Sequence, residues 1–333
     1  MESVHREVPE NKLQQKLKEL LTSDAFEVLP LVLFLAGTLV FFAIFADGFL
    51  TTNNLLNVFR QISYSSILAL GLGIIIIGGG IDLSVGAVAA LAGVISAAAL
   101  EAGLGTPMAI LLGLVAGLGC GAINGSMIAY MGIPPFIMTL ALGFVNQGII
   151  YVWTQGYPIY DGFTDAFLFL GIGYVFDIPT PVLILLLTLI ICYLFIGHTS
   201  YGRYIYALGN SEDSLRACGV NTRRIRLMAY TIAGFCSGVA GIVMTARMQS
   251  GQPSVAIGGG LTLLLYSITG VILGGVDLSG GKGSLFGILG GTLFIGVLTN
   301  GLAIMGFGTY RQNILIGLAL MVALCWNVMR VKK

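Results

Sequence analysis

The chain alternates long apolar runs with short polar segments. A membrane-spanning helix needs about 20 mostly apolar residues, and ten runs have roughly this length. They cover approximately residues 28–47, 62–81, 84–101, 106–130, 134–154, 180–197, 227–249, 258–276, 284–305 and 312–329. The pattern predicts an all-α, polytopic membrane helix bundle with eight to ten transmembrane helices, ten being favoured.

The composition agrees with a chain that works in the bilayer. Hydrophobic residues make up 56% of the sequence and charged residues 9%, against roughly 25% charged in soluble domains. The charges avoid the apolar runs except near their ends, as at Arg247, because a charge at the bilayer centre costs about 2.5–3.5 kcal/mol. The net charge of +1 gives no reason to expect a nucleic-acid partner.

The basic residues indicate an orientation. If the N-terminus is cytoplasmic and the spans alternate, thirteen of the sixteen Lys and Arg residues face the cytoplasm, and only Arg60, Arg247 and Arg311 face outward. Such an excess is the positive-inside signal. Residues 1–27 then form a cytoplasmic segment with a short amphipathic helix at 12–21, residues 28–329 the transmembrane domain, and residues 330–333 a cytoplasmic tail.

Two connections are long. Residues 155–179 lie outside and carry three aspartates, whereas residues 198–226 lie inside and carry five arginines. No cysteine or histidine pattern fits a metal site. The five cysteines lack zinc or CxxC spacing, and we interpret them as small buried apolar residues. The two histidines, His5 and His198, lie outside the apolar runs.

A short motif occurs twice. The segment 79–86, GGIDLSVG, recurs as 274–281, GGVDLSGG, and a later Asn-Gly pair occurs at Asn124 and again at Asn300. Internal repeats are typical of transport folds. The first half holds 19 more residues between its markers, about one membrane crossing, so the two Asn-Gly pairs fall on opposite sides unless one apolar stretch is re-entrant.

The repeated motif has the chemistry of a broken helix. Glycines end one helix, and Asp or Ser can cap the next. We interpret Asp82 and Asp277 as caps. The alternative is a proton or cation site, which we disfavour because both aspartates lie at span ends, near water. The residues assigned to this helix-break motif are Gly79, Gly80, Asp82, Ser84, Gly274, Gly275, Asp277 and Ser279.

These segments resemble the permease subunits of bacterial ABC importers for ribose and other simple sugars, over about residues 28–329. The resemblance is carried in order by 79–86 (GGIDLSVG), 135–140 (PFIMTL), 202–210 (GRYIYALGN), 274–276 (GGV) and 278–284 (LSGGKGS). It implies a bacterial inner-membrane location, separate cytoplasmic ATPase subunits that bind ATP, a periplasmic sugar-binding protein and a second permease copy, with membrane lipid around them. This chain itself would bind no cofactor.

The cytoplasmic loop carries the main functional expectation. In the resembled family, a short helix of this loop docks into a groove of the ATPase. Asn210 or Ser211 can cap such a helix here, with acids in its first turn, and Gly219 can end it. The candidate ATPase-coupling residues are Glu212, Asp213, Ser214, Leu215, Arg216 and Gly219. The alternative is an ordinary cytoplasmic loop with no docking role, because an excess of arginine is expected there in any case.

The sequence departs from the resemblance at residues 258–269. Relatives often carry acids there, in a stretch like YELDAIAA, but this chain has none, which leaves the substrate class open. A neutral solute would need hydrogen-bonding and aromatic groups along its route, although such side chains more often join helices. Candidate pathway-lining residues are Asn57, Gln61, Ser65, Asn146, Gln147, Trp153, Tyr266 and Asn300.

The predicted mechanism is alternating access driven by a partner ATPase. The segment 281–284, GKGS, fails as a Walker A loop because Gly283 stands where Ser or Thr must follow the lysine, so we predict no catalytic residue and no ATPase site in this chain. The main rival is an ion-coupled secondary transporter that uses Asp82 and Asp277. An intramembrane enzyme lacks a nucleophile–base pair or metal cluster at depth, and a structural scaffold would not explain the 198–226 loop.

Overall fold

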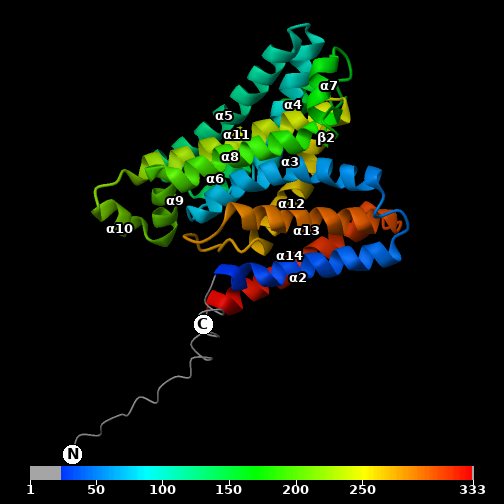
Figure 1. Ribbon diagram of the computed structural model, residues 1–333. Coiled ribbons are helices and arrows are strands. Elements are labelled where there is room, and N and C mark those ends of the chain that lie inside the picture. The colour runs from blue at the N-terminus through cyan, green and yellow to red at the C-terminus, as the bar shows by residue number, and fades with distance from the viewer. Residues whose placement is uncertain (1–23, 332–333) are drawn as a thin grey trace, which may run out of the picture.

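The computed structural model describes residues 24–331, which fold mainly into helices (Figure 1). The elements are α2 (Asp24–Phe45), α3 (Thr52–Ile77), α4 (Val85–Glu101), α5 (Gly105–Met131), α6 (Pro135–Thr154), α7 (Asp165–Ile172), β1 (Tyr174–Val175), β2 (Ile178–Pro179), α8 (Thr180–His198), α9 (Ser200–Asn210), α10 (Glu212–Ala217), α11 (Thr222–Met248), η1 (Val255–Gly259), α12 (Gly260–Leu273), α13 (Leu285–Ile304) and α14 (Thr309–Val331). The amphipathic helix expected at 12–21 lies outside the described residues.

Six helices are long and apolar enough to cross a membrane, namely α3, α5, α6, α8, α11 and α13. Shorter apolar helices are formed by residues 31–45 of α2, by α4 and by α12. Large apolar side chains such as Phe34, Phe144 and Leu187 are exposed on the outside of the bundle, where water would be an unfavourable solvent and lipid is not. The chain is a multi-pass membrane protein.

The helix boundaries differ from the apolar runs in places. The second run was expected to start at residue 62, but α3 begins at Thr52. The added turns are polar, and they are held because Asn54 donates to the Phe49 carbonyl at 2.8 Å and to Asn300 Oδ1 at 2.9 Å. The long connection 155–179 contains α7, which Thr164 caps by accepting from the Phe167 N–H, and the antiparallel β1–β2 pair.

The centre of the bundle is α11, which packs against α3, α4 and α5. The α5–α11 contact is a backbone-to-backbone approach, since a Cβ atom on Gly117 or Gly121 would overlap the backbone of Gly234. Small residues permit this close packing in a bilayer. The helix α11 is mostly buried, whereas α5 lies at the edge of the bundle with much of its surface exposed (Figure 1).

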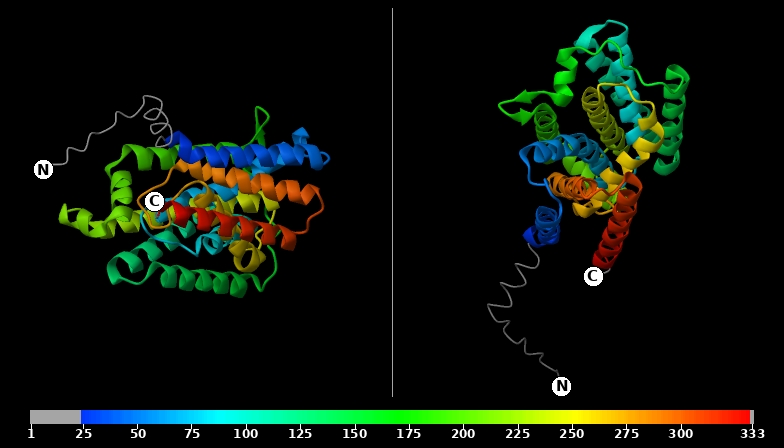
Figure 2. Two further views of the ribbon diagram at one scale, coloured as in Figure 1. Left: turned by 90° about the horizontal axis from the view of Figure 1, so that it is seen from below. Right: turned by 90° about the vertical axis from the view of Figure 1, so that its right-hand side faces the viewer.

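One end of the bundle carries α9 and α10 together with the start of α2 and the end of α14 (Figures 1 and 2). The two broken joints of the repeated motif, 78–84 and 274–284, also lie at this end, because α9 contacts both. Asn124 lies near this end, where it bonds Ser84, whereas Asn300 bonds Asn54 near the other end. The two Asn-Gly markers are therefore at opposite ends of the bundle, and neither α5 nor α13 folds back on itself.

Candidate functional site: the α9–α10 hinge and the two broken joints

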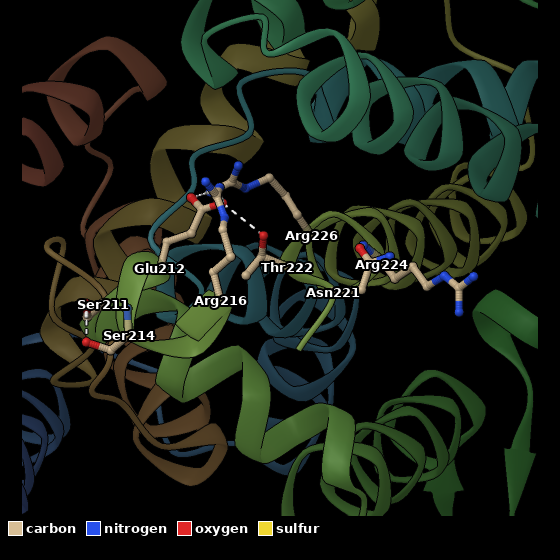
Figure 3. Close-up of polar contacts among 8 residues, drawn as sticks. All are labelled: Ser211, Glu212, Ser214, Arg216, Asn221, Thr222, Arg224 and Arg226. Atoms are coloured by element: carbon tan, nitrogen blue, oxygen red, sulfur yellow. Dashed lines mark hydrogen bonds and ion pairs between the residues drawn. The ribbon is translucent and has the colours of Figure 1, made fainter. Parts of the chain in front are cut away.

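The short helix α10 has well-defined ends. Ser211 is its N-cap, and the Ser211 Oγ accepts from the Ser214 N–H at 3.2 Å, with Glu212 and Asp213 in the first turn (Figure 3). At the other end Gly219 has a φ of +78° and donates to the Arg216 carbonyl at 2.9 Å. This left-handed conformation suits glycine. The N-cap Ser211 and the helix-ending Gly219 are therefore both at the positions expected from the sequence.

Glu212 ties α10 to the first turns of α11. Its carboxylate accepts from Arg226 at 2.7 Å, from Arg216 at 2.9 Å and from the Thr222 hydroxyl at 3.0 Å (Figure 3). Burial raises the pKa of the Glu212 carboxyl, but the bonds and charge of Arg226, with Thr222 and Arg216, outweigh burial and lower the pKa below its usual value. Six residues are too few for a stable isolated helix, so these contacts hold α10 in place.

The outward side of α10 is free to meet a partner. Leu215 is buried against the core, whereas Asp213, Ser214, Arg216 and Gly219 are exposed. Asp213 makes no ion pair among the described residues. The helix also lies at the extreme end of the molecule (Figure 1). Five of the six predicted coupling residues lie on α10, and Gly219 follows two residues after its end. Glu212 and Leu215 anchor the helix, and the other four residues are exposed.

The neighbouring helix α9 connects α10 with both broken joints. Near its end, Gly209 lies against the Ile77 carbonyl of the first joint and the backbone of Gly280 and Gly281 in the second, so close that a Cβ atom would overlap them. The two joints also bond each other, since the Gly281 N–H donates to the Ile77 carbonyl at 2.8 Å. The helix α9 thus contacts both joints directly and leads into α10.

Tyr206 adds a second attachment between α9 and the second joint. Its hydroxyl donates to the Gly283 carbonyl at 2.9 Å. Burial raises the pKa of the Tyr206 phenol, so the phenol keeps the proton that it donates. Asn210 reinforces the turn by donating to the Tyr206 carbonyl at 3.0 Å.

The first joint is a buried polar network. The helix α3 ends in a Gly78-Gly79-Gly80 turn, in which Gly79 has a φ of +75° and Gly80 donates back to the Ile75 carbonyl. Asp82 is only 3% exposed, and its Oδ1 accepts from the Ser84 N–H at 2.7 Å and from the Ser84 hydroxyl at 2.6 Å. The expectation that Asp82 lies near water is therefore wrong, because α4, α5 and α6 close over the turn.

Neighbouring helices complete this network. The Asn124 amide on α5 donates to the Ser84 Oγ at 2.9 Å, and Thr139 on α6 accepts from the Leu83 N–H at 3.1 Å. Tyr230 on α11 donates to the Ile81 carbonyl at 2.9 Å. Three helices thus fix the conformation of one short turn.

The second joint has the same turn in different surroundings. The helix α12 ends at Gly274, Gly275 has a φ of +84°, and Asp277 Oδ1 accepts from the Ser279 N–H at 2.8 Å. Asp277 is half-buried and Ser279 is exposed. The interpretation of Asp277 as a cap of the next helix is wrong, since α13 begins only at Leu285. Asp82 does accept from the residue directly before α4.

The proposed pathway residues are scattered over several helices. Asn57, Gln61 and Ser65 lie on α3, Asn146, Gln147 and Trp153 on α6, Tyr266 on α12 and Asn300 on α13. Two are engaged with other helices, because Asn146 pairs with the Cys120 thiol at 3.7 Å and Asn300 with Asn54 at 2.9 Å. Trp153 is half exposed on the outside of the bundle. The described residues do not gather these eight side chains around one passage.

Sequence reasoning missed several residues that hold the hinge. Thr222 and Arg226 bond Glu212 from 10 and 14 residues further along the chain. These separations match no helix or strand period, so the sequence pattern did not indicate the contacts. Tyr230 reaches Ile81 from α11 without any motif that marks it. Thr139 and Asn124 were visible, since Thr139 lies in the PFIMTL segment and Asn124 in the repeated Asn-Gly pair, but their role needed the tertiary contacts.

The described residues form a mainly helical bundle in which six helices are long and apolar enough to cross a membrane, and no group of metal-ligating side chains is found among them. Residues 54–324 match the family described as branched-chain amino acid transport system / permease component, and the chain belongs to this family. No solved structure matches the chain significantly.

Several curated relatives are similar over most of their length. The chain is 37% identical to the ribose import permease protein RbsC of Escherichia coli K12 over 281 residues, covering 84% of this chain and 86% of the relative. It is 35% identical to RbsC of Bacillus subtilis over 94% of this chain and 96% of the relative. The fructose import permease protein FrcC of Rhizobium meliloti is 31% identical over 93% of this chain and 87% of the relative.

Proposed function

We propose that this chain is the membrane-spanning permease subunit of an ABC importer that carries a simple, ribose-like sugar. The observation that carries the proposal is its similarity to ribose import permeases over at least four fifths of both chains. The α9–α10 hinge supports it, because a capped, exposed helix tied to the core is what a force-transmitting contact requires. A separate ATPase binds and hydrolyses ATP, and a periplasmic binding protein delivers the sugar.

The proposed topology has ten spans with both termini in the cytoplasm. The four shorter or less apolar crossings are α2, α4, α12 and α14. The thirteen basic residues assigned to the inner side support this orientation. Two copies of the chain form the pathway, with the exposed apolar faces against lipid or against each other.

In the proposed mechanism, closure of the ATPase dimer moves α10. The contacts of Gly209 pass this movement to the turns at 78–84 and 274–284, and the helices that meet there alternate between outward-open and inward-open arrangements. The binding protein holds the sugar most tightly, so the contacts along the passage can be weaker. The chain uses no ATP site and no cofactor of its own.

A second candidate is a solute carrier coupled to ions through Asp82 and Asp277. The burial of Asp82 without an ion pair among the described residues favours it. The Asp82 carboxylate already accepts two short hydrogen bonds from Ser84, however, and Asp277 is far less buried. A structural role for the first joint accounts for both observations.

Co-purification tests the proposal. The tagged permease should recover its ATPase from membranes, and Asp213→Ala should reduce recovery several-fold because Asp213 lies on the exposed side of α10. Asp161→Ala, an equally exposed acid in the outer loop, is the matched control and should leave recovery unchanged. Recovery of no ATPase by the wild-type chain would reject the importer.

A further inference from the structure

Two arginines lie at the end of the bundle opposite α10. Arg60 is in the first half of α3, and Arg247 is in the last turn of α11. Charged side chains inside a membrane bundle are costly, and they mark solute or ion routes unless they are paired. The partners of these two arginines therefore decide what this region does.

Neither arginine has an acidic partner among the described residues. The ion pairs found there are those of Glu212, and α12, which packs against α3, carries no acid. The acids of this end are all exposed: Asp47, Glu101, Asp161, Asp165 and Asp177. Arg60 Nε and Arg247 Nη1 are buried and make no hydrogen bond within the described chain. Both residues are partly exposed, and each guanidinium has one buried nitrogen without a partner and no acidic side chain beside it among the described residues.

The two arginines belong to one site. The Arg247 guanidinium lies 5.7 Å from the centre of the Tyr64 ring, and Tyr64 is one helical turn beyond Arg60. Arg60 lies 4.5 Å from the Tyr174 ring and donates to the Ile172 carbonyl at 3.3 Å. The residue before Ile172, Gly171, lies directly against the Arg247 backbone.

A third helix contributes an aromatic side chain. Tyr266 lies on α12, which packs against α3, the helix that carries Arg60 and Tyr64. Aromatic rings offer apolar faces and hydroxyl groups. The site thus joins positive charge to surfaces that suit a sugar ring.

We propose that Arg247 and Arg60 bind an anionic group, a carboxylate or a phosphate, on the sugar that enters this permease. The assignment rests on the proposed function and narrows it from a simple sugar to an acidic sugar derivative. Guanidinium groups match the geometry of carboxylates and phosphates through paired hydrogen bonds. A neutral sugar would leave both guanidiniums without an anionic partner among the described residues.

Binding to the full-length permease in phosphatidylcholine nanodiscs tests the site by calorimetry. D-Ribonate and D-ribose 5-phosphate should each bind at least tenfold more tightly than D-ribose. Arg247→Gln should reduce this ratio to below threefold, and Arg60→Gln should reduce it as well. Arg247→Lys should retain part of the preference, and Arg311→Gln, which removes an exposed arginine at the start of α14, should keep all of it.

Equal binding of the neutral and charged sugars, or no binding of any probe, overturns the proposal. The proposal also fails if a folded Arg247→Gln or Arg60→Gln variant keeps the full preference for the charged sugars over D-ribose. Inorganic phosphate and phosphatidylglycerol nanodiscs separate the sources of the anion. If phosphate binds as tightly as the sugar phosphate, or if the anionic lipid abolishes binding, the site serves a free anion or a headgroup and the substrate assignment fails. Co-purification with the ATPase is independent, so its persistence would leave the importer intact.

Discussion

The two copies of the Gly-Gly-x-Asp-Leu-Ser segment, at 79–84 and 274–279, fold into the same local structure but differ in their surroundings. Each ends a helix with a left-handed glycine, at Gly79 and Gly275, and in each the aspartate accepts from the N–H two residues on. Around Asp82 the turn is buried and bonded to α5, α6 and α11. Around Asp277 it is largely exposed.

The difference shows that the motif encodes a turn, whereas its surroundings decide its mechanical role. The first joint is bonded to three helices. The second is a longer loop of 274–284 that is attached to α9 through Tyr206 and Asn210. We therefore expect the first joint to act as a pivot and a movement of α9 to displace the second joint more readily.

Replacing either aspartate by alanine should reveal the largest difference in stability between the two joints. Asp82→Ala leaves the buried Ser84 N–H and hydroxyl without an acceptor, and we expect a loss of about 2–6 kcal/mol of stability, at about 1–3 kcal/mol for each donor. Asp277→Ala removes one partly exposed bond and should cost at most about 1 kcal/mol. Thermal unfolding in detergent measures both, and equal losses would contradict the assignment of a pivot.

Conservative variants separate acceptor chemistry from charge at the first joint. Asp82→Asn keeps an oxygen for the Ser84 donors and should retain most of the stability lost in Asp82→Ala. A collapse of Asp82→Asn to the level of the alanine variant would show instead that the negative charge is required, as an ion-coupled carrier demands.

Gly209→Ala should act on both joints together. Its Cβ atom would overlap the backbone at Ile77 and at Gly281, and such overpacking costs about 1–3 kcal/mol. In the reconstituted complex, we expect ATP hydrolysis to continue with fewer sugars transported per ATP. Gly197→Ala, at the exposed end of α8 with only the Tyr193 ring nearby, is the control, and an equal effect there would exclude a specific link.

Glu212→Gln should loosen α10 without reaching the joints. It removes the charge that holds Arg226 and Arg216, and we expect about 1 kcal/mol of lost protection in hydrogen exchange at residues 212–219. Asp213→Asn should leave the exchange unchanged, because Asp213 is exposed and forms no ion pair among the described residues. If only the Asp213 variant lost protection, Asp213 would be the residue that anchors α10, and Glu212 would not.

The smallest expected effect concerns pH. The folded state lowers the pKa of Glu212 below its usual 4.5, so its contribution is complete above about that pH and is lost as the pH falls through the lower folded-state value. Protection of α10, corrected for intrinsic exchange, should be flat from pH 6 to 8 and should fall in acid. Glu212→Gln should abolish the fall. A change near neutral pH would implicate another group.

The sequence predicted the helices and the hinge well where local chemistry determines them. Ser211, Gly219 and the glycines of both joints carry their conformations in their side chains or in the lack of one. It failed where a tertiary contact decides, as for the burial of Asp82 beneath α4, α5 and α6, and for the polar first turns of α3. The pathway residues could not be located, because polar residues that join helices and those that line a passage look alike in sequence.

The source of the driving force tests the account most directly. The permease, its ATPase and its binding protein are reconstituted in vesicles, and uptake of labelled sugar is followed with ATP on the ATPase side or with a proton or sodium gradient alone. Sugar should accumulate against its gradient only when ATP and all three components are present. Accumulation by the permease alone, powered by an ion gradient, would show that the chain is a secondary transporter instead.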